Sequence, residues 1–248
     1  MNTIVLIKQV PDTETKVKVK PGATDIDREG VNYVLNPYDE FAAEEAIKIK
    51  EAQGGEVVIV TMGEQGADEA VRTALAMGAD RAIRLDAPSN DPYGCASALA
   101  KALGNESYDL ILTGKQAVDD DQAQVGTLVA TMLGIPCATM VIKTEVGDGS
   151  MKITREIEGG TQEMELPTPC LLTAQKGLNE PRYPSLPGIM KAKRKKLDVV
   201  SPEGEGAKTE VAELEMPPER KAGQVFEGEP EEIVPKVVQL LHDEAKVV

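Results

Sequence analysis

Short apolar runs alternate with amphipathic stretches along the first half of the chain. Four of these runs predict strands, at residues 3–7, 56–61, 82–85 and 109–113. They are rich in leucine and β-branched residues, as expected for strands that are covered on both faces. The stretches between them have helical spacing, so this half of the chain predicts βαβ units around a parallel sheet.

Helices are predicted where apolar residues recur at helical spacing and a glycine follows. The clearest spans residues 38–52, because Asn36 can cap its start, Pro37 suits the first helical position and Gly54 follows its end. Three more are expected, at residues 65–77, 97–103 and 122–133, each ending near a glycine.

The second half of the chain changes character after about residue 135. Alternating residues at 152–157 and 161–166 flank Glu158-Gly159-Gly160 and predict a β-hairpin, and residues 170–173 predict a further strand. Residues 176–190 are rich in proline and glycine and predict a long exposed loop, which a basic run at 191–196 follows.

The last part of the chain predicts an arm rather than a domain. Residues 201–230 are rich in Glu, Pro and Gly and have few large apolar side chains, so they cannot bury enough surface to fold alone. A final helix at 230–245 has one apolar face that should dock on another surface. We therefore expect a domain at residues 1–200 and a tether with a C-terminal helix at 201–248.

The composition excludes several classes of function. The 248 residues contain 27 Lys and Arg against 42 Asp and Glu, and a net charge of -15 argues against binding nucleic acid or anionic membranes. No apolar run approaches the roughly 18 residues of a membrane helix, and the first residues are too short and strand-like for a signal peptide. These features predict a cytoplasmic protein without membrane insertion.

The residues that usually perform chemistry are scarce. Cys95, Cys137 and Cys170 lie far apart without a CxxC pair, which disfavours zinc, iron–sulfur and disulfide frameworks. His242 is the only histidine, so a histidine base or a histidine-ligated metal has almost no raw material. We expect no metal site and no catalytic residue.

The sharpest local motif is GKQAVDDDQAQVG, residues 114–126, which leaves the fourth strand and enters the helix expected from Gln122. Ligands of open α/β sheets bind at this edge, and a helix start there suits a phosphate. However, Asp119, Asp120 and Asp121 repel phosphate unless they cap the helix or point elsewhere. The residues alone therefore leave a phosphate site and a capping cluster equally open.

No GxGxxG follows the first strand, and the chain has no GxxxxGK[ST] motif, so neither a dinucleotide fingerprint nor a P-loop is supported. Asn36 and the backbone N–H groups that open the first helix lie near the same sheet edge. They can contact a ligand there, or Asn36 can be an ordinary helix cap.

Several segments in a fixed order resemble the beta subunits of electron-transfer flavoproteins. They are VLIKQVPD (5–12), LNPYDEFAAEEA (35–46), TALAMGAD (73–80), the motif at 114–126, ITREIEGG (153–160) with the following PCLLTA, and LNEPRYPSLPGIMKAKRKK (178–196). The resemblance covers most of the chain, from about residue 4 to residue 199.

The resemblance implies a fold, cofactors and a site. The fold is a Rossmann-like α/β domain of the adenine-nucleotide-hydrolase type, with an open, mostly parallel sheet, a β-hairpin extension and a C-terminal arm. It pairs with an alpha subunit that carries a redox-active FAD, and the beta subunit holds AMP. The implied AMP site comprises Leu6, Asn36, Pro37, Tyr38, Asp39, Met62, Gly114, Lys115, Gln116, Ala117, Val118, Asp119, Asp120, Asp121, Gln122, Ala123, Gln124 and Val125.

The same resemblance implies a docking function for the proline-rich loop. Residues 183–190 would be the recognition loop for acyl-CoA or related dehydrogenases, with Leu186 as an apolar anchor and Lys191 and Arg194 beside it. A quinone-reducing acceptor would take the electrons onward. The tether and last helix would wrap onto the alpha subunit, which gives the apolar helix face a partner.

Two alternatives remain. Residues 123–126 read AQVG, which resembles the electron-bifurcating branch of the family, where a second FAD replaces AMP. Bifurcating members have glycine where this chain has Asp120, and residues 91–98 lack their ADTxAT-like stretch, so we favour AMP. A more remote alternative is a nucleotide-sensing protein of the universal-stress type or a hydrolase, but neither explains the tail.

Overall fold

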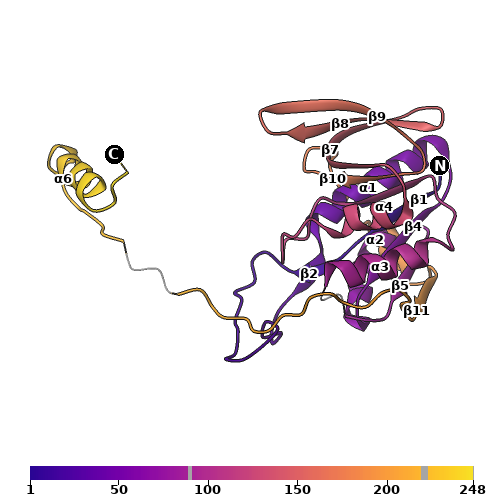
Figure 1. Ribbon diagram of the computed structural model, residues 1–248, viewed down its shortest axis with the longest axis horizontal. Coiled ribbons are helices and arrows are strands. Elements are labelled where there is room, and N and C mark those ends of the chain that lie inside the picture. The colour runs from indigo at the N-terminus through magenta and orange to yellow at the C-terminus, as the bar shows by residue number, and fades with distance from the viewer. Residues whose placement is uncertain (89–90, 219–222, 248) are drawn as a thin grey trace. The chain divides into compact units, whose positions relative to one another are not determined.

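A nine-stranded sheet forms the centre of the first of two compact units, Met1–Leu214 and Glu215–Val248 (Figure 1). The structure, a computed structural model, describes residues 1–88, 91–218 and 223–247. Residues 219–222 of the expected tether and residue 248 lie outside the described residues. The first unit extends to Leu214, beyond the domain boundary expected at residue 200.

The sheet is mostly parallel and has a hairpin at one edge. Within the described part of the chain its order is β11-β5-β4-β1-β6-β10-β7-β8-β9, and only the β7–β8 and β8–β9 pairs are antiparallel. The strands are β1 (Thr3–Leu6), β4 (Val57–Met62), β5 (Arg81–Leu85), β6 (Leu110–Gly114), β7 (Cys137–Val146), β8 (Ser150–Ile157), β9 (Gly160–Pro167), β10 (Cys170–Ala174) and β11 (Leu197–Val200). The Rossmann-like α/β prediction is confirmed.

Helices cover both faces of the sheet because alternate strand residues point to opposite sides. Val5 packs with α1 (Pro37–Gln53) and α2 (Asp68–Met77), whereas Leu6 packs with α3 (Pro92–Leu103) and α4 (Val125–Leu133). A short 3-10 turn, η1 (Gln65–Ala67), precedes α2. A separate antiparallel pair joins β2 (Gln9–Pro11) to β3 (Tyr33–Leu35).

Several predicted boundaries are wrong. α4 begins at Val125 rather than at Gln122, and α3 begins at Pro92, where Asp91 caps it, rather than at Ser97. The predicted loop at 176–190 ends in a helix, α5 (Leu186–Ala192), because Ser185 caps a first turn that tolerates Pro187. Strand β11 was not expected, since its place is set by long-range pairing with β5.

The second unit contains one helix within its described residues, α6 (Pro230–Asp243), close to the predicted range. None of its residues is buried, and Val234, Val238 and Leu241 are 57%, 51% and 38% exposed. These three apolar side chains therefore lie on an exposed side of the helix.

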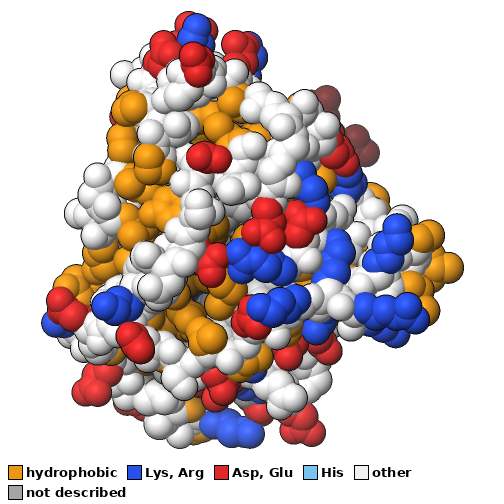
Figure 2. All heavy atoms as spheres, turned by 90° about the vertical axis from the view of Figure 1, so that its right-hand side faces the viewer, with side chains coloured by type: hydrophobic (Ala, Val, Ile, Leu, Met, Phe, Trp, Pro, Cys, Tyr) orange, Lys and Arg blue, Asp and Glu red, His pale blue; other side chains and the backbone are white. Residues whose placement is uncertain are grey.

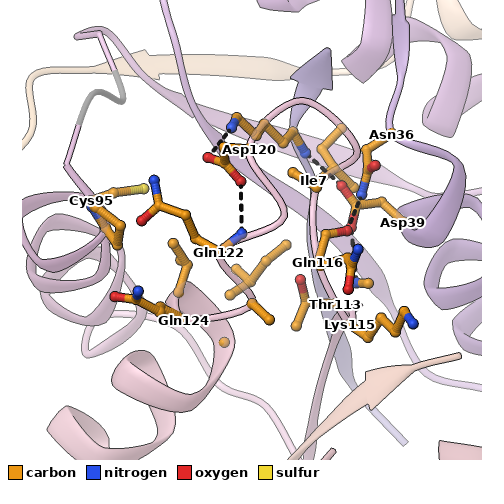
Figure 3. Close-up of a pocket in the computed structure, with 18 of the residues that line it drawn as sticks. Ile7, Asn36, Asp39, Cys95, Thr113, Lys115, Gln116, Asp120, Gln122 and Gln124 are labelled. Carbon is orange, nitrogen blue, oxygen red and sulfur yellow. Dashed lines mark hydrogen bonds and ion pairs between the residues drawn. The ribbon is translucent and has the colours of Figure 1, made fainter. Parts of the chain in front are cut away.

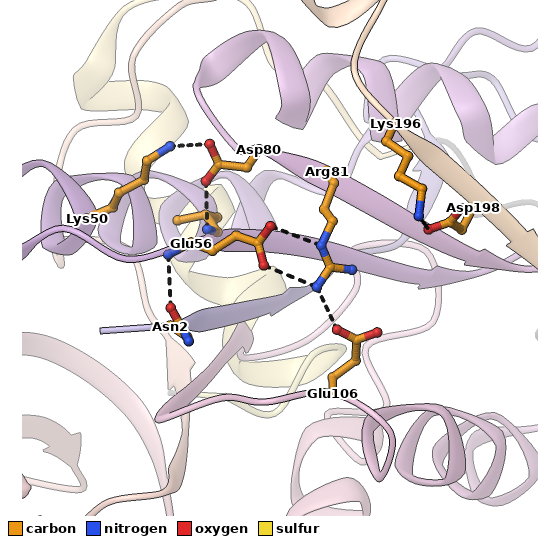
Figure 4. A network of polar contacts seen from close by, with 9 residues as sticks. Asn2, Lys50, Glu56, Asp80, Arg81, Glu106, Lys196 and Asp198 are labelled. Atoms are coloured by element: carbon orange, nitrogen blue, oxygen red, sulfur yellow. Dashed lines mark hydrogen bonds and ion pairs between the residues drawn. The ribbon is translucent and has the colours of Figure 1, made fainter.

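The amino edge of the sheet carries a dense polar network (Figure 4). Arg81 at the start of β5 donates to both carboxylate oxygens of Glu56 at 3.0 and 3.2 Å and to Glu106 at 2.6 Å. These hydrogen bonds raise the pKa of Arg81. Asp80 pairs with Lys50 and accepts the N–H of Val57 at 2.9 Å, so charges and strand-end amides satisfy one another.

Much of the surface charge is paired locally despite the net charge of -15. Acidic and basic side chains both occur across the face shown in Figure 2. In the described residues, no helix is long and apolar enough to cross a membrane.

Candidate functional site

A cleft opens where the order of the parallel strands reverses. The chain runs from β1 to β4 and β5 on one side, then returns to place β6 on the other side of β1. In open α/β sheets, ligands bind outside the carboxyl ends of the strands at this reversal. The cleft lies at the ends of β1 and β6 and is partly open to solvent, with about 750 Å³ of empty space when the open part is included (Figure 3).

The cleft brings together most of the residues that the resemblance implied. Those lining it are Leu6, Asn36, Asp39, Met62, Gly114, Lys115, Gln116, Ala117, Asp120, Gln122, Ala123, Gln124 and Val125. Pro37, Tyr38, Val118, Asp119 and Asp121 do not line it. The sequence reasoning missed Ile7, Lys8, Pro92, Cys95, Leu99, Thr113 and Gly126, which also line it.

The loop before α4 exposes a group of backbone donors. Asp121 and Ala123 have left-handed backbones with φ of 51° and 53°, while Gln124 is right-handed. No acceptor among the described residues pairs with the N–H groups of residues 123–126, and no side chain caps α4. Alternating left- and right-handed residues point successive N–H groups into one concavity, which suits an anion.

The left-handed alanine is itself informative. An L-residue other than glycine, asparagine or aspartate loses about 1–2 kcal/mol in this conformation, because its Cβ crowds the backbone. Such strain persists where the surrounding structure enforces it and is common at ligand-binding loops. At Ala123 the strain coincides with N–H groups that have no partner in the described part of the chain, a combination that suits an anion-binding loop.

Lys8 offsets part of the negative charge of the three aspartates. Its Nζ lies 2.8 Å from Asp119 and 2.9 Å from Asp120. Burial lowers the pKa of Lys8, but hydrogen bonds and charge from Asp119 and Asp120 outweigh it and raise the pKa. Asp121 accepts from the side chain of Gln116. All three carboxylates therefore have partners inside the protein.

Asp39 joins the two strands that flank the cleft. Its carboxylate accepts the N–H of Lys8 at 2.7 Å and the N–H of Gly114 at 2.8 Å, at the ends of β1 and β6. Burial raises the pKa of Asp39 to about 7, against these hydrogen bonds, which lower it. Asp39 thus fixes the spacing of the strand ends from which the cleft is built.

Asn36 holds the loop rather than the helix. Its side chain donates to the carbonyl of Gln116 at 2.9 Å and accepts the N–H of Val118 at 3.2 Å. It makes no side-chain cap for α1, so the capping prediction for Asn36 is wrong. The start of α1 and the loop after β6 are consequently tied together.

Two glycines allow the close approaches on which the cleft depends. A Cβ on Gly114 would lie 2.5 Å from Oδ1 of Asp39, and one on Gly126 would lie 2.8 Å from the Cγ2 methyl of Thr113. The first contact lets Asp39 reach β6, and the second seats the start of α4 on the end of β6.

The expected docking segment stands on a rigid base. Arg182 donates to both oxygens of Glu44 at 2.8 and 2.9 Å and to Glu51 at 2.6 and 3.0 Å, both on α1. Beyond it, Tyr183 is 96% and Leu186 75% exposed. Lys191 and Arg194 are also exposed, so this segment presents apolar and basic side chains together.

The basic run does not form one continuous patch. Lys195 turns inward and donates to the carbonyls of Leu75 and Ala79, and burial lowers the pKa of Lys195. Lys196 pairs with Asp198 at 2.7 Å.

Among the residues that the structure describes, no cluster of three His, Cys, Asp or Glu could hold a metal.

Comparison with known proteins identifies the family. A model described as the electron transfer flavoprotein domain matches residues 24–204, which is most of the chain. The electron transfer flavoprotein subunit beta of Bacillus subtilis is 41% identical over the full length of both chains. The chain belongs to the electron transfer flavoprotein beta-subunit family.

Other beta subunits agree with this assignment. That of Thermoanaerobacterium thermosaccharolyticum is 42% identical, covering 98% of each chain, and that of Homo sapiens is 40% identical, covering 97% of this chain and 98% of its own. Electron transfer flavoproteins are electron carriers in which a beta subunit forms a heterodimer with an alpha subunit and the heterodimer carries FAD. The cleft and the expected docking segment both belong to a chain of this kind.

Proposed function

We propose that this chain binds AMP in the cleft at the ends of β1 and β6, as the beta subunit of a cytoplasmic, heterodimeric electron carrier. The observation that carries the proposal is the set of N–H groups at residues 123–126, which have no partner in the described residues and lie beside a left-handed Ala123. FAD, held mainly by the alpha subunit, supplies the redox chemistry. This chain supplies position and docking.

The cleft offers separate surroundings for the two ends of the nucleotide. The backbone donors of residues 123–126 and the positive end of the α4 dipole would hold the phosphate. Leu6, Met62 and Leu99 line the cleft with apolar side chains that would shield the base from water. Lys8 would reduce the repulsion between Asp119, Asp120 and the phosphate.

A second FAD in place of AMP is the competing proposal, and it would make the chain a bifurcating subunit. The sequence AQVG at residues 123–126 favours it. Against it stands Asp120, whose carboxylate pairs with Lys8 and accepts the N–H of Gln122 at 3.2 Å. Asp120 is thus built into the loop where bifurcating members have glycine.

Counting nucleotides tests the proposal. The chain is co-expressed with its alpha partner, the purified complex is denatured, and the released nucleotides are quantified. One FAD and one AMP per heterodimer is the expected result. Two FAD and no AMP would establish the competing proposal instead.

The docking part of the proposal concerns Leu186. We expect Leu186→Ala to slow electron transfer from an acyl-CoA dehydrogenase by about tenfold, because a buried apolar anchor contributes on the order of 1–2 kcal/mol to an interface. Flavin content should stay constant, since Leu186 lies outside the cleft. Transfer is measured with each variant under single-turnover conditions.

Val17→Ala is the matched control, because Val17 is an exposed apolar residue outside the docking segment, 44% exposed. It should leave transfer unchanged. Equal rates for Leu186→Ala and the wild type would remove Leu186 as the anchor.

By the same proposal, a quinone-reducing protein accepts the electrons, and the apolar face of α6 packs on the alpha subunit.

A further inference from the structure

The segment at residues 204–209, here called the strap, is fastened to the start of α3 although it has no regular structure. The N–H of Glu205 donates to Oγ of Ser97 at 2.7 Å, and the Tyr93 hydroxyl donates to the Glu205 carboxylate at 3.0 Å. A Cβ on Gly94 would lie 3.0 Å from the backbone nitrogen of Ala207, so the two backbones touch.

Asp91 is the centre of this attachment. Its Oδ2 accepts the N–H of Gly94 at 2.7 Å, which caps α3, and also the N–H of Lys208 at 3.2 Å. Its Oδ1 accepts the N–H of Thr209 at 3.1 Å and the Thr209 hydroxyl at 2.5 Å. One carboxylate that is only 5% exposed therefore joins the helix start to the strap.

The helix that Asp91 holds is a wall of the cleft. Pro92, Cys95 and Leu99 of α3 line the cleft, while Asp91 itself does not. Figure 3 shows the Cys95 side chain directed toward Gln122 of the loop across the cleft. Movement of the first turn of α3 would therefore change the width of the cleft.

We propose that Asp91 is a positioning residue for the nucleotide: by binding the strap to the first turn of α3, it holds this wall of the cleft in place. The inference rests on the proposed nucleotide-binding function. A binding site whose wall is fixed in advance loses less ordering entropy when the ligand enters, and its affinity rises accordingly. Asp91 acts through α3 and makes no contact with the ligand.

The composition of the strap makes this attachment sensitive to single changes. Residues 204–209 read GEGAKT and include no large apolar side chain, so polar contacts hold the strap. Because coupling between two sites is reciprocal, a nucleotide in the cleft should in turn hold the strap more firmly against α3.

Two variants weaken the attachment and leave α3 capped. Asp91→Asn keeps an oxygen for the N–H of Gly94, since Asn caps helices as well as Asp, but its amide nitrogen cannot accept from the Thr209 N–H. Thr209→Val removes the hydroxyl donor at nearly constant shape. Two variants serve as controls. Thr209→Ser keeps a hydroxyl donor at this position, and Glu210→Gln changes a neighbouring exposed residue without a partner among the described residues.

AMP and FAD are titrated separately into the nucleotide-free, full-length chain. We expect Asp91→Asn to weaken AMP binding about 3- to 30-fold, the range typical of coupling through a protein. Thr209→Val should weaken it less, and Thr209→Ser and Glu210→Gln should stay within about twofold of wild type. Melting temperatures show whether a variant has lost stability. If Asp91→Asn melts at a much lower temperature than the wild type, the AMP affinity of Thr209→Val tests the proposal instead.

Amide hydrogen exchange supplies a second readout that a purely structural strap would not move. In the wild type, AMP should slow exchange at the amides of Lys208 and Thr209, and Asp91→Asn should abolish this protection. Wild-type AMP affinity in both variants, with exchange unaffected by AMP, would overturn the role of Asp91 and leave AMP binding intact. If the wild-type chain binds FAD but not AMP, the AMP assignment is overturned. The role of Asp91 is then tested by titrating FAD into the same variants.

Discussion

The two edges of one sheet differ in how their charged side chains and backbone N–H groups are satisfied. At the amino edge, Arg81 binds Glu56 and Glu106, and Asp80 accepts a strand-end N–H, so charges and amides have protein partners. At the carboxyl edge, the N–H groups of residues 123–126 have none among the described residues. Donors that the protein leaves unpaired are available to a ligand.

Two costs to stability lie at the carboxyl edge. The backbone of Ala123 is left-handed, and burial raises the pKa of Asp39 to about 7. Each feature lowers stability, and a domain is stable by only about 5–15 kcal/mol in total. The paired amino edge and the buried sheet offset this loss, so one edge stabilises the fold while the other stays open for binding.

The largest effect should come from Gly114→Ala, which breaks the carboxyl edge. The new Cβ would lie 2.5 Å from Asp39 Oδ1. It would disrupt the hydrogen bonds by which the Asp39 carboxylate joins the ends of β1 and β6. We expect a loss of about 3 kcal/mol in the free energy of unfolding, together with loss of the copurifying nucleotide. Gly160→Ala, where nothing lies within 4 Å, should change neither urea midpoint nor nucleotide content.

Arg81→Met tests the other edge and should separate stability from binding. It leaves Glu56 and Glu106 without their partner, which should cost about 2 kcal/mol of stability. Lys196→Met, at a more exposed pair shown in the same network, should cost less than about 0.5 kcal/mol (Figure 4). An Arg81→Met protein with reduced nucleotide content but unchanged stability would refute the division between the edges.

A matched pair at Ala123 examines the left-handed backbone. Ala123→Val adds a β-branched side chain at φ 53° and should weaken AMP binding by about tenfold, a loss near 1–2 kcal/mol. Ala123→Gly relieves the strain and should stabilise the protein by up to about 1 kcal/mol while binding persists. Titration calorimetry and urea unfolding measure both quantities, and equal affinities in the two variants would argue against this geometry.

A pH dependence of the free energy of unfolding is expected from Asp39. Its pKa is raised from 3.8 to about 7, so between these values the folded protein binds more protons than the unfolded chain. This contribution to stability is complete below pH 3.8 and is lost as the pH rises through 7. Asp39→Asn should remove that slope, and a wild-type slope retained by the variant in urea unfolding at several pH values would contradict the assignment.

The sequence predicted the parts of the fold that carry local signals. Asn36-Pro37 and Gly54 bracket α1 within a residue or two, and the Gly159 turn marks the β8–β9 hairpin. Strand β11 and the strap carry no such signal. They are ordered by pairing with β5 and by contacts with α3, which no local pattern reveals.

The candidate site was predicted in outline and missed in its electrostatics. The aspartate run resembles a helix start, but pairing with Lys8 helps to hold it in a loop, so α4 begins at Val125. Lys8 itself follows an ordinary strand, and nothing in its spacing predicts that it neutralises residues more than a hundred positions away. The sequence does not predict the left-handed backbone of Ala123 either, because the residues that signal that conformation are glycine and asparagine.

The most direct measurement follows backbone amides of both edges by NMR while AMP is titrated into the isotope-labelled, nucleotide-free chain. The account predicts large, saturable, one-to-one shifts at the amides of residues 123–126 and none at Glu56 and Val57. Unchanged amides at residues 123–126 under saturating AMP would contradict the claim that the carboxyl edge is a nucleotide-binding site.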